Sequence, residues 1–124
     1  MKKILVVDDE QDIVGAIAIR LKSSGFEVIT AGDGMEGLQK ARIENPDLIL
    51  LDVMLPKLDG YKVCRMLKFD EKYKHIPIIM VTGKFSDEDK RKGLAVGADH
   101  YVLKPFDHKE LLATIESVLS KREG

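Results

Sequence analysis

Asp47-Leu-Ile-Leu-Leu-Asp-Val-Met-Leu-Pro-Lys-Leu-Asp-Gly60 is the stretch that decides the fold of this 124-residue chain. Four consecutive apolar residues, 48–51, lead directly into Asp52. An apolar run without alternation is typical of a strand that is buried on both faces, as in a parallel sheet. Pro56 excludes a continuing central strand, and Asp59-Gly60 is typical of a turn. We therefore expect a strand over 48–51 with Asp52 at its carboxyl end.

Asp52 has two interpretations at this position. In open α/β sheets, the carboxyl ends of the strands form the edge where ligands bind and reactions occur. An isolated aspartate at a strand end can also simply cap a loop or a helix. The choice depends on whether other strands place reactive side chains at the same edge.

The rest of the chain repeats the pattern of an apolar strand followed by a helix. Residues 4–7 form a second unbroken apolar run, and further strands are expected over 27–31, 77–81 and 100–103. The expected helices end near Gly25, Asn45-Pro46, Phe69 and Gly97, and a fifth follows Asp107. Five strands alternating with five helices predict an α/β fold with a parallel, doubly wound sheet and helices on both faces.

The first helix, 11–24, carries more aliphatic side chains than one core face needs. We expect its inward face to consist of Ile13, Ala16, Ile17 and Leu21. Val14, Ala18 and Ile19 fall outside that face. One or two exposed aliphatic residues are ordinary; the alternative hypothesis is that Val14 and Ala18 belong to a docking patch for a partner.

Residues 32–37, Gly-Asp-Gly-Met-Glu-Gly, match the spacing of the dinucleotide-binding fingerprint. They follow the second strand rather than the first, however. Asp33 and Glu36 would also repel a pyrophosphate where a helix N-terminus should attract one. We therefore interpret the segment as a turn and the start of a helix.

Composition predicts a soluble, cytoplasmic protein of one domain, with 44% hydrophobic and 33% charged residues. A net charge of −1 provides no basic surface, so we expect no direct nucleic-acid binding. Cys64 is the single cysteine, which excludes an internal disulfide. We expect neither a membrane span nor a signal peptide.

Polar side chains follow four of the predicted strands at their carboxyl ends: Asp8 and Asp9, Asp52, Thr82, and Lys104. If the first and third strands are neighbours, three carboxylates converge and repel one another. A hard cation such as Mg²⁺ relieves that repulsion with oxygen ligands. Together with the lysine and the hydroxyl, this group predicts a phosphoryl site in which one carboxylate is free to be the nucleophile.

These motifs are similar to those of a known family. Val6-Val7-Asp8-Asp9-Glu10, the segment from Leu51 to Pro56 with Asp59-Gly60, Val81-Thr82-Gly83 and Lys104-Pro105-Phe106 resemble the receiver domain of bacterial two-component response regulators. The resemblance covers essentially the whole chain as one domain, 1–124. It implies a flavodoxin-like fold with strand order 2-1-3-4-5.

The resemblance also implies roles for individual residues. Asp52 would be the phospho-acceptor, and Mg²⁺ would bind to Asp9, Asp52 and the backbone carbonyl of Met54, with Asp8 acting mainly through water. Lys104 would pair with the phosphoryl oxygens, beside a cis bond to Pro105.

Thr82 and Tyr101 would be the switch residues of such a domain. Thr82 would move to bond the phosphoryl group, and Tyr101 would turn inward. The surface of the fourth helix, fifth strand and fifth helix would then change its preference for partners. The implied partners are a sensor histidine kinase and a downstream output domain or protein, with a phosphorylation-dependent dimer as an option.

Two other functions compete with a switch. A phosphatase or phosphotransferase that forms an aspartyl-phosphate needs a general acid or base beside the nucleophile, and neither Met54 nor Lys84 can serve as one. The same two residues predict slow self-dephosphorylation. A flavin- or nucleotide-binding module is disfavoured because three carboxylates without a metal would repel a phosphate.

Overall fold

The computed structural model describes residues 1–84 and 86–123, with side chains described through residue 121. Its centre is one parallel sheet in the order β2-β1-β3-β4-β5. The strands are β1 (Lys3–Val7), β2 (Glu27–Ala31), β3 (Leu48–Leu51), β4 (Ile78–Thr82) and β5 (His100–Leu103). The predicted fold class and strand order are therefore confirmed.

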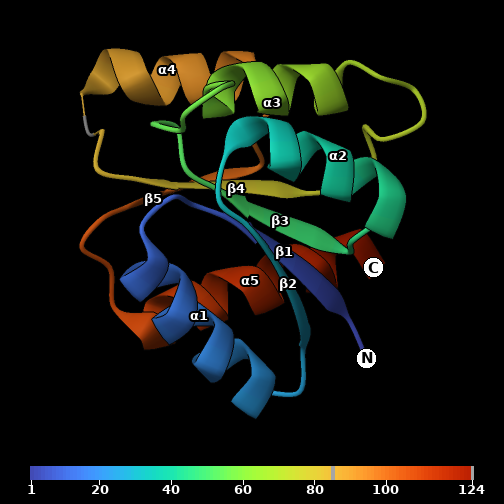
Figure 1. Ribbon diagram of the computed structural model, residues 1–124, viewed down its shortest axis with the longest axis vertical. Coiled ribbons are helices and arrows are strands. Elements are labelled where there is room, and N and C mark those ends of the chain that lie inside the picture. Colours follow the sequence, from blue (N-terminus) through green and yellow to red (C-terminus); the bar gives the residue numbers. More distant parts are fainter. Residues whose placement is uncertain (85, 124) are drawn as a thin grey trace.

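Five helices connect and follow these strands: α1 (Gln11–Ser23), α2 (Gly34–Glu44), α3 (Gly60–Lys68), α4 (Asp87–Ala95) and α5 (His108–Glu123). Figure 1 shows α2, α3 and α4 on one face of the sheet and α1 with α5 on the other. No helix among the described residues is both long and apolar enough to cross a membrane.

The unbroken apolar run of β3 is explained by burial on both sides of the sheet. All four of its residues are buried. Ile49 and Leu51 belong to the core that includes residues of α2 and α3, whereas Leu48 and Leu50 belong to the core that includes residues of α1 and α5. Because successive side chains of a strand point to opposite faces, two helical layers require apolar residues at every position.

The predicted inward face of α1 is partly wrong. Ile17 and Leu21 are buried as expected, but Val14 is also buried, at 6% exposure, while Ala16 is exposed. Val14 packs in the same core as Leu111 of α5. The helix faces α5 as well as the sheet, and this rotates its buried stripe away from Ala16. Val14 therefore cannot form the proposed docking patch.

Two glycines of the 32–37 segment are explained by close packing rather than by a nucleotide. A Cβ atom on Gly34 would lie 1.7 Å from the carbonyl oxygen of Leu58, and one on Gly37 would lie 2.7 Å from a methyl group of Val7. The Asp33 carboxylate caps α2 by accepting a 2.8 Å hydrogen bond from the Glu36 amide. The segment starts a helix, as predicted.

Candidate functional site

The register of the sheet places Asp8 and Asp52 next to each other. Val7 of β1 pairs with Leu51 of β3, so the residues that follow them leave the sheet together. The amide of Asp52 continues the ladder with a 3.0 Å bond to the Val7 carbonyl. Both aspartates are buried. Two carboxylates thus meet at the carboxyl edge of the central strands.

Lys104 reaches this pair from the loop after β5. Its Nζ donates to Asp8 Oδ2 at 2.7 Å, to Asp52 Oδ2 at 2.9 Å and to Glu10 Oε1 at 2.9 Å. The Lys104 amide bonds the Thr82 carbonyl at 2.9 Å, which fixes the start of the loop. The Lys104–Pro105 peptide is cis, as the resemblance implied.

The charges of this cluster do not balance. One oxygen from each of Asp8, Glu10 and Asp52 lies within 4.8 Å of the others, and a single ammonium serves all three. Burial, together with the nearby charge of Asp52, raises the pKa of Asp8 despite its bond to Lys104. Burial alone would lower the pKa of Lys104, but its bonds to the three carboxylates raise that pKa well above its ordinary value. The ammonium is therefore held charged in a site with surplus negative charge.

A cavity of about 320 Å³ opens onto this cluster, and the residues around it include most of the predicted site. Its lining residues are Asp9, Glu10, Asp52, Met54, Thr82, Gly83 and Lys104. Asp9 is exposed there, whereas Asp8 is buried behind it. The Met54 amide donates to Asp52 Oδ1 at 3.2 Å, and its side chain is 62% exposed. The cavity gives a substrate direct access to Asp52.

Glu10 is the residue of this site that sequence reasoning did not select. Its acidic side chain was visible as the third acid after β1, but an exposed glutamate at the start of a helix usually has no such partner. Its carboxylate nevertheless bonds Lys104, and its backbone amide donates to Asp8 Oδ1 at 2.9 Å. Glu10 thus competes with Asp52 for the one ammonium.

The donor atoms of the pocket suit a hard divalent cation. The ligands available are the carboxylate oxygens of Asp8, Glu10 and Asp52, with Asp9 at the rim. Mg²⁺ prefers oxygen ligands and keeps several waters, which the cavity has room to admit. The surplus negative charge would be relieved by such an ion. The pocket therefore fits the metal that the resemblance implies.

Thr82 and Tyr101 lie on the adjacent strands β4 and β5, where Tyr101 pairs with Met80, two residues before Thr82. The Thr82 side chain is fully buried beside the cavity, and its Oγ1 accepts a 3.4 Å bond from the Lys84 amide. The partly buried Tyr101 hydroxyl donates to the Lys84 carbonyl at 2.7 Å. Both switch candidates therefore contact the backbone of one residue, in the loop between β4 and α4.

Gly60 ties the turn after β3 to the phospho-acceptor candidate. Its amide donates to the Val53 carbonyl at 2.8 Å, and a Cβ atom there would lie 2.0 Å from the Asp52 carbonyl oxygen. Asp59 caps α3 by accepting a bond from the Lys62 amide at 3.0 Å. Only glycine allows this approach, so the Asp59-Gly60 pair places α3 directly against the backbone of Asp52.

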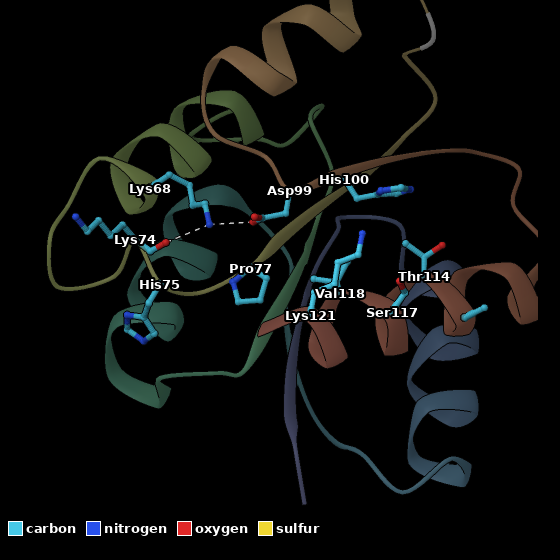
Figure 2. Close-up of a pocket in the computed structure, with 11 residues that line it drawn as sticks. Lys68, Lys74, His75, Pro77, Asp99, His100, Thr114, Ser117, Val118 and Lys121 are labelled. Atoms are coloured by element: carbon cyan, nitrogen blue, oxygen red, sulfur yellow. Dashed lines mark hydrogen bonds and ion pairs between the residues drawn. The ribbon is translucent and has the colours of Figure 1, made fainter. Parts of the chain in front are cut away.

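A larger hollow, of about 630 Å³, lies at the opposite edge of the sheet, near the starts of β4 and β5 (Figure 2). Its partly buried lysine, Lys68, bonds Asp99 at 2.9 Å and the carbonyls of Lys74 and Ile76 at 3.1 and 2.9 Å. A lysine has three donors, and all three are used here. Among the described residues of its lining, Asp99 is the one acidic residue, against Lys68, Lys74 and Lys121, so this hollow lacks the cluster of carboxylates that could hold a metal ion beside a nucleophile.

Comparison with known proteins agrees with the geometry. The family model of the response regulator receiver domain matches residues 4–116. The chain is 51% identical over 122 residues to the alkaline phosphatase synthesis transcriptional regulatory protein PhoP of Bacillus subtilis (strain 168). That match covers 98% of this chain and 50% of the relative. The chain thus spans about half the length of the curated relatives it matches.

Solved structures show the same fold over nearly whole chains. A CheY-like response regulator receiver domain protein from Methanospirillum hungatei JF-1 has a TM-score of 0.94 and 34% identity, covering 99% of this chain and 97% of that one. The receiver domain of sensor histidine kinase PA1611 from Pseudomonas aeruginosa PAO1, with a magnesium ion coordinated in its active site cleft, has a TM-score of 0.88 and 31% identity, covering 96% and 98%. This chain belongs to the response regulator receiver family and is a signalling switch controlled by phosphorylation.

Proposed function

We propose that Asp52 is the phospho-acceptor of this receiver domain and that the phosphoryl donor is the phosphohistidine of a sensor histidine kinase. The observation that carries the proposal is the contact of Lys104 Nζ with Asp52 Oδ2, at 2.9 Å, between residues that directly follow β5 and β3. A buried carboxylate at the floor of a cavity, beside a fixed cation, has the surroundings that a nucleophile for phosphoryl transfer requires.

In the proposed reaction, an oxygen of the Asp52 carboxylate attacks the phosphorus of the donor. An O–P bond forms, the P–N bond to the histidine breaks, and the histidine nitrogen leaves with the electron pair and becomes protonated from solvent. Lys104 would move from the carboxylates toward the phosphoryl oxygens, where its ammonium would offset their charge. Its loop position after β5 allows this shift without disturbing the sheet.

Asp9, Asp52 and the Met54 carbonyl would hold Mg²⁺, and Asp8 would contribute mainly through water. The bound ion would neutralise charge on the phosphoryl oxygens. Asp9 is exposed, as a ligand at the rim must be, and the buried Asp8 and the exposed Glu10 add negative charge beside it. Glu10 would release Lys104 when the phosphoryl group arrives.

The domain would act as a switch that catalyses its own phosphorylation and slow dephosphorylation, rather than as an enzyme with steady turnover. Met54 lines the cavity at Asp52, and Lys84 lines an adjoining surface cavity that also includes Met54. Neither can act as a general base at neutral pH. A water molecule attacking the phosphorus in line would therefore gain no proton acceptor from them, and the phosphorylated state would be long-lived.

Phosphorylation would alter the face formed by α4, β5 and α5. Thr82 would turn toward the phosphoryl group, and Tyr101 would give up its bond to the Lys84 carbonyl and turn inward. An output domain or protein, or a second copy of the chain, would then bind the altered face. Direct nucleic-acid binding by these 124 residues is not part of the proposal, because their net charge is −1.

The test uses a small phosphoryl donor with Mg²⁺ and no kinase. We expect about one phosphate per chain, labile to hydroxylamine as an acyl phosphate is, on the peptide that contains Asp52. Continuous release of phosphate from excess donor, without accumulation on the protein, would favour the phosphatase alternative. Phosphate on another residue would contradict the assignment.

A further inference from the structure

The helix α4 is held by few apolar contacts. Among its described residues 87–95, Gly93 alone is buried, and Leu94 is 63% exposed. A Cβ atom on Gly93 would lie 2.9 Å from the ring of Tyr101, so the helix backbone rests on that ring. Helices with little buried apolar surface open easily, and other contacts must then determine their position.

Two tyrosine hydroxyls supply such contacts. The Tyr61 hydroxyl donates to the backbone carbonyl of Asp89, in the first turn of α4, at 3.0 Å. The Tyr101 hydroxyl donates to the Lys84 carbonyl, in the loop that precedes α4, at 2.7 Å. A carbonyl oxygen has two lone pairs, so Asp89 can accept this bond in addition to one within the helix. Both rings pack against the same core.

Tyr61 connects α4 to the phospho-acceptor candidate by a short and rigid route. It follows Gly60, whose backbone is packed against the Asp52 carbonyl and bonded to Val53. From this fixed position in the first turn of α3, its side chain reaches across to α4. A surface cavity of about 590 Å³, lined in part by Met54, Tyr61, Lys84 and Lys92, leaves space beside the tyrosine. The contact is therefore a tether on a helix that has room to move.

Both hydroxyls remain donors at neutral pH. Burial raises the pKa of Tyr61. Burial, together with the neighbouring Tyr61 hydroxyl, raises the pKa of Tyr101 far above neutrality. The tether is thus present throughout the physiological range of pH.

We infer that Tyr61 is a positioning residue that holds α4 in its unphosphorylated place and opposes the rearrangement that phosphorylation of Asp52 drives. The inference rests on the proposed function, because it assumes that Tyr101 and the loop at Lys84 move when Asp52 is modified. The bond of Tyr61 to Asp89 must lengthen or break when this loop carries the start of α4 with it. A variant that lacks this hydrogen bond before phosphorylation would therefore rearrange more easily.

The test compares the wild type with Tyr61→Phe, which removes only the hydroxyl. The control is Tyr73→Phe, since Tyr73 packs against the same core from the loop before β4. The first measurement is amide hydrogen exchange in metal-free buffer. We expect amides of residues 90–93 to exchange about three- to ten-fold faster in the Tyr61 variant, the size of one net hydrogen bond, and to be unchanged in the control.

The second measurement is the concentration of beryllofluoride, a mimic of the phosphoryl group, that half-saturates the protein in Mg²⁺. We expect about three-fold tighter binding by Tyr61→Phe and no change in Tyr73→Phe. A merely structural role would lower thermal stability without tightening this binding. Unchanged exchange in α4, or unchanged or weaker beryllofluoride binding by the variant, would overturn the inference. A wild type that binds no beryllofluoride would instead contradict the proposed function, and the exchange measurement would still decide whether the tether exists.

Discussion

Lys104 and Lys68 lie at opposite edges of the same sheet, and their side chains are equally buried, at 12% exposure each. Each makes three bonds of 2.7 to 3.1 Å. The partners differ in charge. Lys68 meets one carboxylate and two neutral carbonyls, whereas Lys104 meets three carboxylates. The geometry is shared, but only the direct partners of Lys104 leave carboxylate charges without a matching cation.

This difference separates a structural lysine from a reactive one. The charges of Lys68 and its partner Asp99 cancel, so the contacts of Lys68 require no further ion. The lysine joins the end of α3 to the loop before β4 and to the residue before β5. The environment of Lys104 has two surplus negative charges, and burial makes that surplus costly. A second cation is therefore favoured there, and a phosphoryl group can follow it.

The largest effect should come from the carboxylates that the two lysines contact. Asp52→Asn keeps the shape of the side chain but removes the nucleophile, so we expect phosphorylation by a small donor to fall at least a hundred-fold, measured as hydroxylamine-labile phosphate. Asp99→Asn, the matched change beside Lys68, should leave phosphorylation near the wild-type level. Equal loss in both variants would indicate a damaged fold rather than a lost acceptor.

Removing each lysine should separate charge from packing. Lys104→Met leaves three carboxylates without a cation and should lower the free energy of unfolding by about 2–3 kcal/mol in metal-free buffer. Lys68→Met loses bonds to two neutral carbonyls and one half-exposed carboxylate, so we expect it to lower the free energy of unfolding by about 1–2 kcal/mol. Urea unfolding with and without Mg²⁺ is the measurement. Millimolar Mg²⁺ should stabilise the Lys104 variant more than the Lys68 variant, and equal stabilisation would contradict the charge argument.

The access of water to the phosphorylated Asp52 gives a third comparison, between two exposed methionines. Met54 is exposed at the rim of the Asp52 cavity and cannot orient a water molecule. Met54→Asn should speed loss of phosphate about ten-fold, the scale of about 1.4 kcal/mol in the barrier. Met66 is a second exposed methionine, on α3, and Met66→Asn is the control, which should not change the rate of phosphate loss. Decay of purified phosphoprotein in Mg²⁺ without kinase provides the rate, and unchanged decay in the Met54 variant would show that this side chain does not limit hydrolysis.

The smallest effect should be a pH dependence at Asp8. Because burial raises its pKa above the ordinary value of 3.8, the folded protein binds a proton more readily there than the unfolded chain. The ionised carboxylate therefore costs stability, and this cost grows as the pH rises through the raised pKa. The free energy of unfolding of Asp8→Asn, relative to wild type, should increase by up to about 1 kcal/mol as the pH rises from below 3.8 to neutrality.

Metal-free urea unfolding at several pH values measures this difference. Asp99→Asn again serves as the control, since its carboxylate belongs to the balanced pair with Lys68. The predicted direction would be wrong if the free energy of unfolding of Asp8→Asn, relative to wild type, stayed constant or fell as the pH rose.

The sequence by itself determined the sheet and the edge where chemistry is expected. Unbroken apolar runs at 4–7 and 48–51 require burial on both faces, and this requirement leads to parallel strands covered by helices on each side. Parallel strands end at a common edge, so Asp8, Asp52 and Lys104 were expected on the same side of the sheet. The capping box that starts α4 is also predictable from sequence, because its two hydrogen bonds join Ser86 and Asp89, only three residues apart.

Only the tertiary structure decided how each side chain is used. The buried face of α1 includes Val14 because α5 lies beside that helix. The spacing of apolar residues along α1 does not indicate which other helix packs against it. The bond of Glu10 to Lys104 and the bond of Tyr61 to α4 join residues 94 and 28 positions apart. Such contacts depend on the distance between elements in space. Local pattern specifies where strands and helices lie, whereas the packing of one element on another determines the limits of each buried face and which polar groups meet.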